Sequence, residues 1–140
     1  MTVDSAADAG ATLVSKSELF RQADFVTIHL VLSRRTRGLI GAPEIRLMKP
    51  TARLINTSRG EVVDETALVE ALQTGSIAGA ALDVFGQEPL PEGHAFRTLN
   101  NVLATPHIGY VGEDLYRTFF GDVVASISSW LDATESRTRP

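Results

Sequence analysis

The chain has 140 residues, a net charge of −4 and no cysteine, and this length fits one domain with a single core. Its 44% hydrophobic and 21% charged residues are ordinary globular usage, which argues against wholesale disorder. The negative charge, with scattered Lys and Arg, argues against nucleic acid or an anionic membrane as the main partner. Without cysteine, disulfides, thiolate catalysis and a Cys-based zinc site are excluded.

The sequence carries no targeting or membrane signal. No apolar run approaches the ~18 residues that a membrane span needs. The first ten residues, MTVDSAADAG, lack the basic and apolar segments of a signal peptide. We therefore expect a cytoplasmic protein.

Short apolar runs alternate with helical patterns along the chain. Residues 1–10 are small and acidic and are expected to form a flexible N-terminus, and residues 133–140 a flexible tail. Strands are predicted over residues 11–15, 24–32, 52–58, 77–85 and 101–106. Helices are predicted over residues 17–22, 43–48, 64–74 and 112–131. Within the third helix, Asp64 is the expected N-cap and Gly75 the expected stop.

This alternation predicts an α/β fold. The strands read as apolar on both faces, which is typical of a parallel sheet with helical crossovers. Residues 11–110 are expected to form this domain, and residues 111–132 a long amphipathic helix. The helix is indicated by apolar residues that recur every four positions from Leu115 to Leu131.

Polar side chains follow three of the predicted strands. Arg59 follows the strand at 52–58. Residues 77–82 of the next strand end in Asp83, with Glu88 five residues on, and His107 follows the last strand. In an open parallel sheet, ligands bind outside the carboxyl ends of the strands. We therefore expect these four side chains to lie along one edge.

Three of these residues suit one reaction. A histidine beside a carboxylate is a natural general acid–base pair, since the carboxylate stabilises the imidazolium. An arginine can bind a substrate carboxylate with two parallel hydrogen bonds. Reduction of a 2-keto acid would use Arg59 to anchor the carboxylate and polarise the carbonyl, and His107 to supply the proton.

The blocks around these residues resemble a known family. INTSRGEVVDETALVEAL, GAALDVFGQEPL and NVLATPHIGY are similar to signature blocks of the D-isomer-specific 2-hydroxyacid dehydrogenases and occur in that family's order. The resemblance extends over roughly residues 11–132. It implies a Rossmann-like, doubly wound cofactor domain, of which this chain would be the distal half.

The resemblance also implies roles for individual residues. It makes Arg59 the ligand of the substrate carboxylate and carbonyl, His107 the acid–base group and Glu88 its partner. It implies NAD or NADP as cofactor, with Asp83 at the nicotinamide carboxamide. The residues implied to bind or lie near the cofactor are Asn56, Thr57, Ser58, Arg59, Asp83, His107 and Gly109.

The family's phosphate-binding motif, G-x-G-x-x-G, has no counterpart here, because no two glycines of the chain are two positions apart. Family members are longer and begin with a substrate-binding domain. We therefore expect a truncated or split NAD(P)-dependent dehydrogenase acting on a small 2-keto or 2-hydroxy acid, weak or inactive by itself. Its expected partner is a missing N-terminal half or a second copy. The alternative is a non-catalytic half-Rossmann remnant that serves association or binding.

Each residue also has an ordinary structural interpretation. Arg59 could bind loop carbonyls, and His107 could be a packed residue. His29 is expected to be a packed or wall residue, and Asp83 could be an N-cap or turn residue. Glu88 could be a solvated loop carboxylate, and His94 is expected to be exposed. The histidines lack ligand spacing, so no metal site is predicted.

Overall fold

The computed structural model describes residues 3–138. The chain divides into two compact units, Met1–His107 and Ile108–Pro140. The first contains every strand that the structure describes, and the second consists of a short irregular segment and one long helix.

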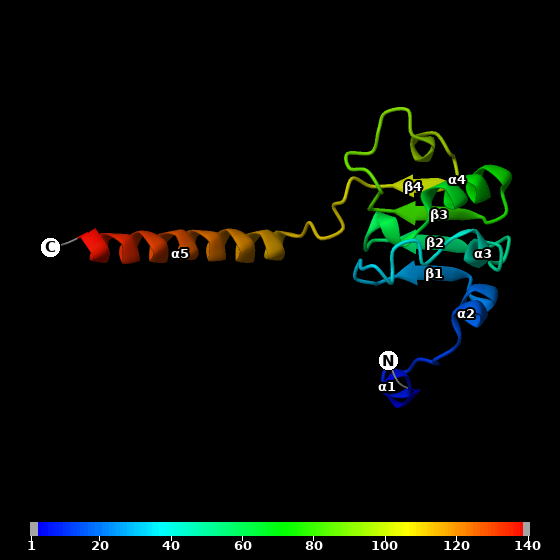
Figure 1. The fold of residues 1–140 in the computed structure, drawn as a ribbon, viewed down its shortest axis with the longest axis horizontal. Helices are drawn as coiled ribbons and strands as arrows, with labels where there is room; N and C mark the ends of the chain where they lie inside the picture. Colours follow the sequence, from blue (N-terminus) through cyan, green and yellow to red (C-terminus); the bar gives the residue numbers. More distant parts are fainter. Residues whose placement is uncertain (1–2, 139–140) are drawn as a thin grey trace. The chain divides into compact units, whose positions relative to one another are not determined.

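A parallel sheet of four strands forms the first unit (Figure 1). Its strands are β1 (Phe25–Ile28), β2 (Arg53–Asn56), β3 (Gly79–Leu82) and β4 (Val102–Ala104), neighbours in the order of the sequence. The predicted α/β fold with a parallel sheet is confirmed. The strands are shorter than predicted, because pairing stops where the neighbouring strand ends, and residues 11–15 form no strand.

Helices connect and precede the strands. They are α1 (Val3–Asp8), α2 (Lys16–Gln22), α3 (Ala42–Ile45) and α4 (Glu65–Thr74), with single 3-10 turns at Gly60–Val62 and Ala95–Arg97. The predicted ends of α4 are confirmed. The Asp64 side chain accepts a hydrogen bond from the Ala67 N–H, and Gly75 ends the helix in the left-handed conformation.

Only one face of the sheet is covered. Val26, Ile28 and Leu54 are buried in the core, against side chains that include Phe20 of α2 and Leu68 of α4. On the other face Phe25 and Leu103 are 61% and 66% exposed. Within the first unit, the prediction that the strands are buried on both faces is therefore wrong, because the core side chains of α2, α3 and α4 cover one face of the sheet only.

The ends of the chain carry more helix than predicted. Residues 3–8 form α1, and the helix predicted at 112–131 is α5 (Glu113–Thr138), which continues into the expected tail. Residues 139–140 lie outside the described part. None of the helices within residues 3–138 is long and apolar enough to cross a membrane.

Candidate active site at the carboxyl ends of the strands

The strand register brings the polar segments to one edge of the sheet. Ile28 pairs with Asn56, Asn56 with Leu82, and Leu82 with Ala104, so the four strands end in one row. The backbone pairing continues for one residue beyond β3 and beyond β4. There the Asp83 N–H donates to the Asn56 carbonyl and the Thr105 N–H donates to the Leu82 carbonyl. The expectation that the segments after β2, β3 and β4 lie together is therefore met by the backbone itself.

Asn56 shapes the loop that carries Arg59. Its side chain is buried, accepts a hydrogen bond from the Ser58 N–H at 3.0 Å and donates to the Arg59 carbonyl at 2.9 Å. The Ser58 hydroxyl donates to the Leu30 carbonyl and fastens the loop to the segment after β1. Two residues that the sequence placed near a cofactor thus also hold the arginine loop.

Arg59 is exposed, and one of its guanidinium nitrogens, Nη1, donates to the Ser58 carbonyl at 2.6 Å. This contact agrees with the structural interpretation of Arg59. It uses only part of the guanidinium, which carries five N–H donors. The same side chain can therefore still receive a carboxylate.

Gly60 connects the arginine loop to the loop after β3. A Cβ atom at Gly60 would overlap the carbonyl group of Phe85 and lie 2.5 Å from the Gly86 nitrogen. Only glycine permits this approach of two backbones. The contact fixes Arg59 relative to the segment that begins at Phe85.

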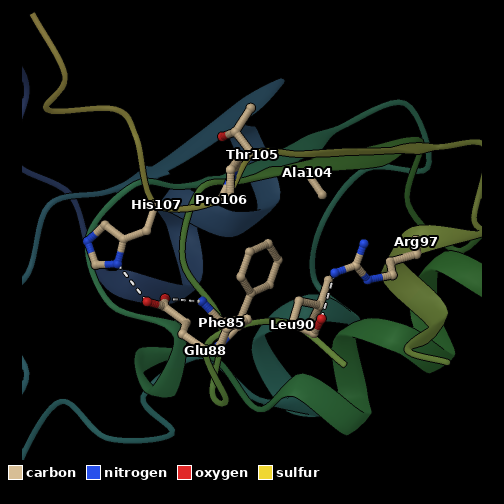
Figure 2. Close-up of a pocket in the computed structure, with 9 residues that line it drawn as sticks. Phe85, Glu88, Leu90, Arg97, Ala104, Thr105, Pro106 and His107 are labelled. Atoms are coloured by element: carbon tan, nitrogen blue, oxygen red, sulfur yellow. Dashed lines mark hydrogen bonds and ion pairs between the residues drawn. The ribbon is translucent and has the colours of Figure 1, made fainter. Parts of the chain in front are cut away.

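Glu88 and His107 form a direct pair (Figure 2). His107 Nδ1 lies 2.7 Å from Glu88 Oε2, while Glu88 Oε1 accepts the Phe85 N–H at 2.9 Å. Burial acts to raise the pKa of the Glu88 carboxyl, but the hydrogen bonds from His107 and Phe85 outweigh it, so the pKa lies below its ordinary value. Glu88 is therefore a carboxylate that holds the imidazole and sets Nδ1 as its protonated nitrogen.

His107 has a left-handed backbone, with a φ of 55°, and is the one non-glycine residue in that conformation within the described part. Such a conformation costs of order 1–3 kcal/mol and persists where its surroundings enforce it. Here the His107 N–H donates to the Thr105 carbonyl at 3.0 Å. The turn directs the ring back toward Glu88, and strained residues of this kind cluster at functional sites.

Asp83 is a buried carboxylate at the end of β3. The Thr105 hydroxyl, from the segment after β4, donates to its Oδ1 at 2.5 Å. The pair fixes the Asp83 carboxylate at the same edge as Asn56. Thr105 lies within the strand predicted at 101–106, and sequence reasoning gave it no role. The Phe85 N–H was missed because backbone donors leave no mark in a sequence.

A cavity of about 550 Å³ opens beside the pair. Arg97 stands in its wall and donates to the Leu90 carbonyl (Figure 2). It also donates to the Pro91 carbonyl, and the two contacts hold its guanidinium in the loop. The lining residues are Phe85, Glu88, Pro89, Leu90, Arg97, Ala104, Thr105, Pro106 and His107. Arg59 is not among them, so the cavity is lined by Glu88 and His107 but not by the arginine that was expected to bind a substrate carboxylate.

Several expected residues have other surroundings. His29 lies beyond the end of β1, is exposed and contacts the Thr27 hydroxyl at 3.0 Å, so of the two expected placements, packed or in a wall, the packed one is wrong. His94 was expected to be exposed but is largely covered and contacts Glu65. Thr57 is exposed, and Gly109 belongs to the second unit, so their roles stay predictions. Within the described residues no group of three or more His, Asp or Glu could hold a metal ion.

Comparison with known proteins places these features in one family. Residues 2–109 match the model of "D-isomer specific 2-hydroxyacid dehydrogenase, NAD binding domain". The chain is 46% identical over 129 residues, 92% of its length, to a D-3-phosphoglycerate dehydrogenase of Synechocystis. It is 49% identical over 102 residues, 73% of its length, to a glyoxylate reductase of Thermococcus litoralis. It spans only 23% and 30% of these two relatives.

A solved structure agrees with the sequence matches. A D-isomer specific 2-hydroxyacid dehydrogenase from Xanthobacter autotrophicus, in complex with NADPH and MES, is 43% identical with a TM-score of 0.64. The alignment covers 66% of this chain and 29% of that protein. The match of residues 2–109, more than half of the chain, decides the assignment. This chain belongs to the NAD-binding domain family of the D-isomer specific 2-hydroxyacid dehydrogenases.

Proposed function

We propose that the chain supplies the catalytic edge of an NAD(P)-dependent dehydrogenase that interconverts a small 2-keto acid and its 2-hydroxy acid. The observation that carries the proposal is the Glu88–His107 pair at 2.7 Å, beside a cavity and on the edge where the strands end. The family of the chain supports this reaction.

The edge fits one end of a nicotinamide cofactor. Asp83 is a buried carboxylate held by Thr105, and it can accept hydrogen bonds from a carboxamide NH₂ group. Asn56, Thr57 and Ser58 are proposed to lie near the same cofactor. No G-x-G occurs in the 140 residues, so the pyrophosphate end has no such glycine turn to hold it here. When bound, the cofactor supplies the hydride that reduces the keto carbon.

His107 would move the proton. Because Nδ1–H is directed to Glu88, the other ring nitrogen, Nε2, is the atom that exchanges a proton with the substrate oxygen. In the direction of reduction, Nε2 gives its proton to the oxygen as the carbonyl becomes a hydroxyl. Glu88 stabilises the imidazolium that carries this proton and holds the ring in place.

Arg59 would bind the substrate carboxylate. Its exposed guanidinium stands on a loop fixed by Asn56 and by the Gly60 contact. The backbone of Arg59 therefore does not have to become ordered when substrate binds. The planar fork binds a carboxylate with two hydrogen bonds and fixes the orientation of the substrate. This role requires the guanidinium to exchange or share its contact with the Ser58 carbonyl.

We further propose that the 140-residue chain alone is weakly active or inactive. Without a pyrophosphate site, cofactor affinity is lower by about tenfold for each 1.4 kcal/mol of binding free energy that such a site would contribute. Calorimetric titration with NADH should therefore show no binding at micromolar concentrations. The alternative, a non-catalytic association or binding module, predicts the same result for the chain alone.

A chimera separates these two functions. The glyoxylate reductase of Thermococcus litoralis matches this chain at 49% identity, and its matching segment can be replaced by residues 11–110 of this chain. Reduction of a 2-keto acid by the chimera, followed by NADH absorbance, would support the enzymatic proposal. A folded chimera without activity would favour the binding module.

Two variants of the chimera identify the residues responsible. His107→Gln should lower kcat by about 10²–10⁴-fold, the usual contribution of a general acid–base group. Arg59→Lys should raise KM, because an ammonium lacks the planar fork. Arg46→Lys, on the exposed C-terminal end of α3, is the matched control and should change neither constant.

We propose that the chain associates with a second copy or with a separate N-terminal half through its exposed apolar residues. The α5 helix exposes a run of apolar residues, including Leu115, Phe119 and Ile127, and the sheet exposes Phe25 and Leu103. Large apolar side chains that gather on one exposed helix or sheet face are typical of an interface. A second copy, or a separate N-terminal half, would cover it.

A further inference from the structure

The loop that carries Glu88 is held at both of its ends by one carboxylate. Glu65, the first residue of α4, accepts the Gly86 N–H through Oε2 at 3.3 Å and contacts His94 Nε2 through Oε1 at 3.0 Å. Gly86 and His94 lie on either side of Glu88 in the chain. The two contacts therefore close the segment from Gly86 to His94 into a loop with its ends tied to α4.

A second hydrogen bond fixes which nitrogen of His94 carries the proton that Glu65 accepts. His94 Nδ1 accepts the Phe96 N–H at 3.2 Å, so the ring proton of neutral His94 lies on Nε2 and is donated to Glu65. The ring also lies against Phe96, at 4.8 Å between centroids, and Phe96 is buried in the core. His94 is thus fixed in position and tautomer.

We propose that Glu65 is a positioning residue for the Glu88–His107 pair, acting through its contacts with Gly86 and His94. The proposal rests on the proposed function for its importance in catalysis. Glu65 touches neither His107 nor the cavity beside it. It acts by fixing the backbone from which Glu88 reaches both the Phe85 N–H and His107.

The chemistry requires a carboxylate at this position. Both partners of Glu65 are donors, the Gly86 N–H and the His94 Nε2–H, and a carboxylate has two acceptor oxygens for them. The amide of a glutamine has one acceptor oxygen and a donating NH₂ group. Glu65→Gln can satisfy one of the two contacts, whereas Glu65→Ala satisfies neither.

The test is an NMR comparison of the full chain with its variants, without any need for turnover. The exchange rate of the Phe85 amide reports the Phe85–Glu88 hydrogen bond, and a ¹³C titration of the Glu88 carboxyl reports its pKa. In Glu65→Ala we expect the Phe85 amide to exchange at least about tenfold faster, which is about 1.4 kcal/mol. The pKa of Glu88 should rise toward its ordinary value as the pair loosens.

Controls separate positioning from general destabilisation. Glu70→Ala, on an exposed position of the same helix, should change neither measurement. The exchange of the Leu72 amide, in the last turn of α4 (Glu65–Thr74) and away from Glu65, should stay unchanged in Glu65→Ala. If α4 opens in Glu65→Ala, the Glu65→Gln variant tests the inference instead. It should shift the Phe85 exchange rate and the Glu88 pKa in the same directions as expected for Glu65→Ala, by smaller amounts.

An unchanged Phe85 exchange rate and Glu88 pKa in both Glu65 variants would overturn the inference. These measurements do not depend on catalysis. An inactive chimera would contradict the proposed function but leave the positioning role of Glu65. An active chimera with unchanged NMR measurements would support the proposed function and contradict the positioning role.

Discussion

The contact of Gly60 with the backbone of Phe85 gives the sharpest prediction about this edge. Gly60→Ala would place a methyl group on the Phe85 carbonyl and 2.5 Å from the Gly86 nitrogen. Adding atoms to a packed site costs about 1–3 kcal/mol. We expect about 3 kcal/mol, the upper end of that range, because the obstructing atoms are backbone that cannot rotate away.

Urea unfolding followed by circular dichroism measures this loss. With a slope of about 1–3 kcal/mol per molar urea, a loss of ~3 kcal/mol lowers the midpoint by about 1–3 M. The matched control is Gly93→Ala in the loop after β3, where a Cβ would meet no atom within 4 Å. Equal midpoints for Gly60→Ala and Gly93→Ala would refute the close approach and with it the fixed position of Arg59.

Three further predictions concern the edge and the exposed surfaces. Glu88→Gln should lower stability at neutral pH and lose this effect on acidification, because a pKa below the unfolded value gives stability that disappears as pH falls through the folded pKa. Urea unfolding across pH checks it, and a pH-independent difference would contradict it. Thr105→Val should cost about 1.5–3 kcal/mol by removing a hydrogen bond to the Asp83 carboxylate, with Thr105→Ser restoring it in the same unfolding assay. Sedimentation of the purified chain should show self-association that weakens in Phe119→Asp, whereas a sharply monomeric parent would contradict the interface at α5.

The candidate site shows where sequence reasoning is strong. Arg59, Asp83 and His107 could each be placed after a strand, because apolar runs mark strands locally and parallel strands end at one edge. The pairing of Glu88 with His107, across 19 positions, was expected from the family resemblance and is present in the structure. The roles of these residues in catalysis stay proposals.

Other features could not be read from the chain. The overlap that forces a glycine at position 60 involves a backbone 25 positions away, and the contact of Glu65 with His94 spans 29 positions. His94 was expected to be exposed because it lies in a loop that contains Pro and Gly. It is covered because Glu65 and Phe96 reach it from α4 and the core.

The sequence by itself determined the alternation of strands and helices, the ends of α4 at Asp64 and Gly75, and the side chains available at the edge. These features follow from local patterns of apolar residues and from the chemistry of single side chains. Tertiary structure decided which face of the sheet is covered, the left-handed turn at His107 and the closure of the Glu88 loop on α4. Each of these depends on atoms brought together from distant parts of the chain, and no local pattern records which partners will meet.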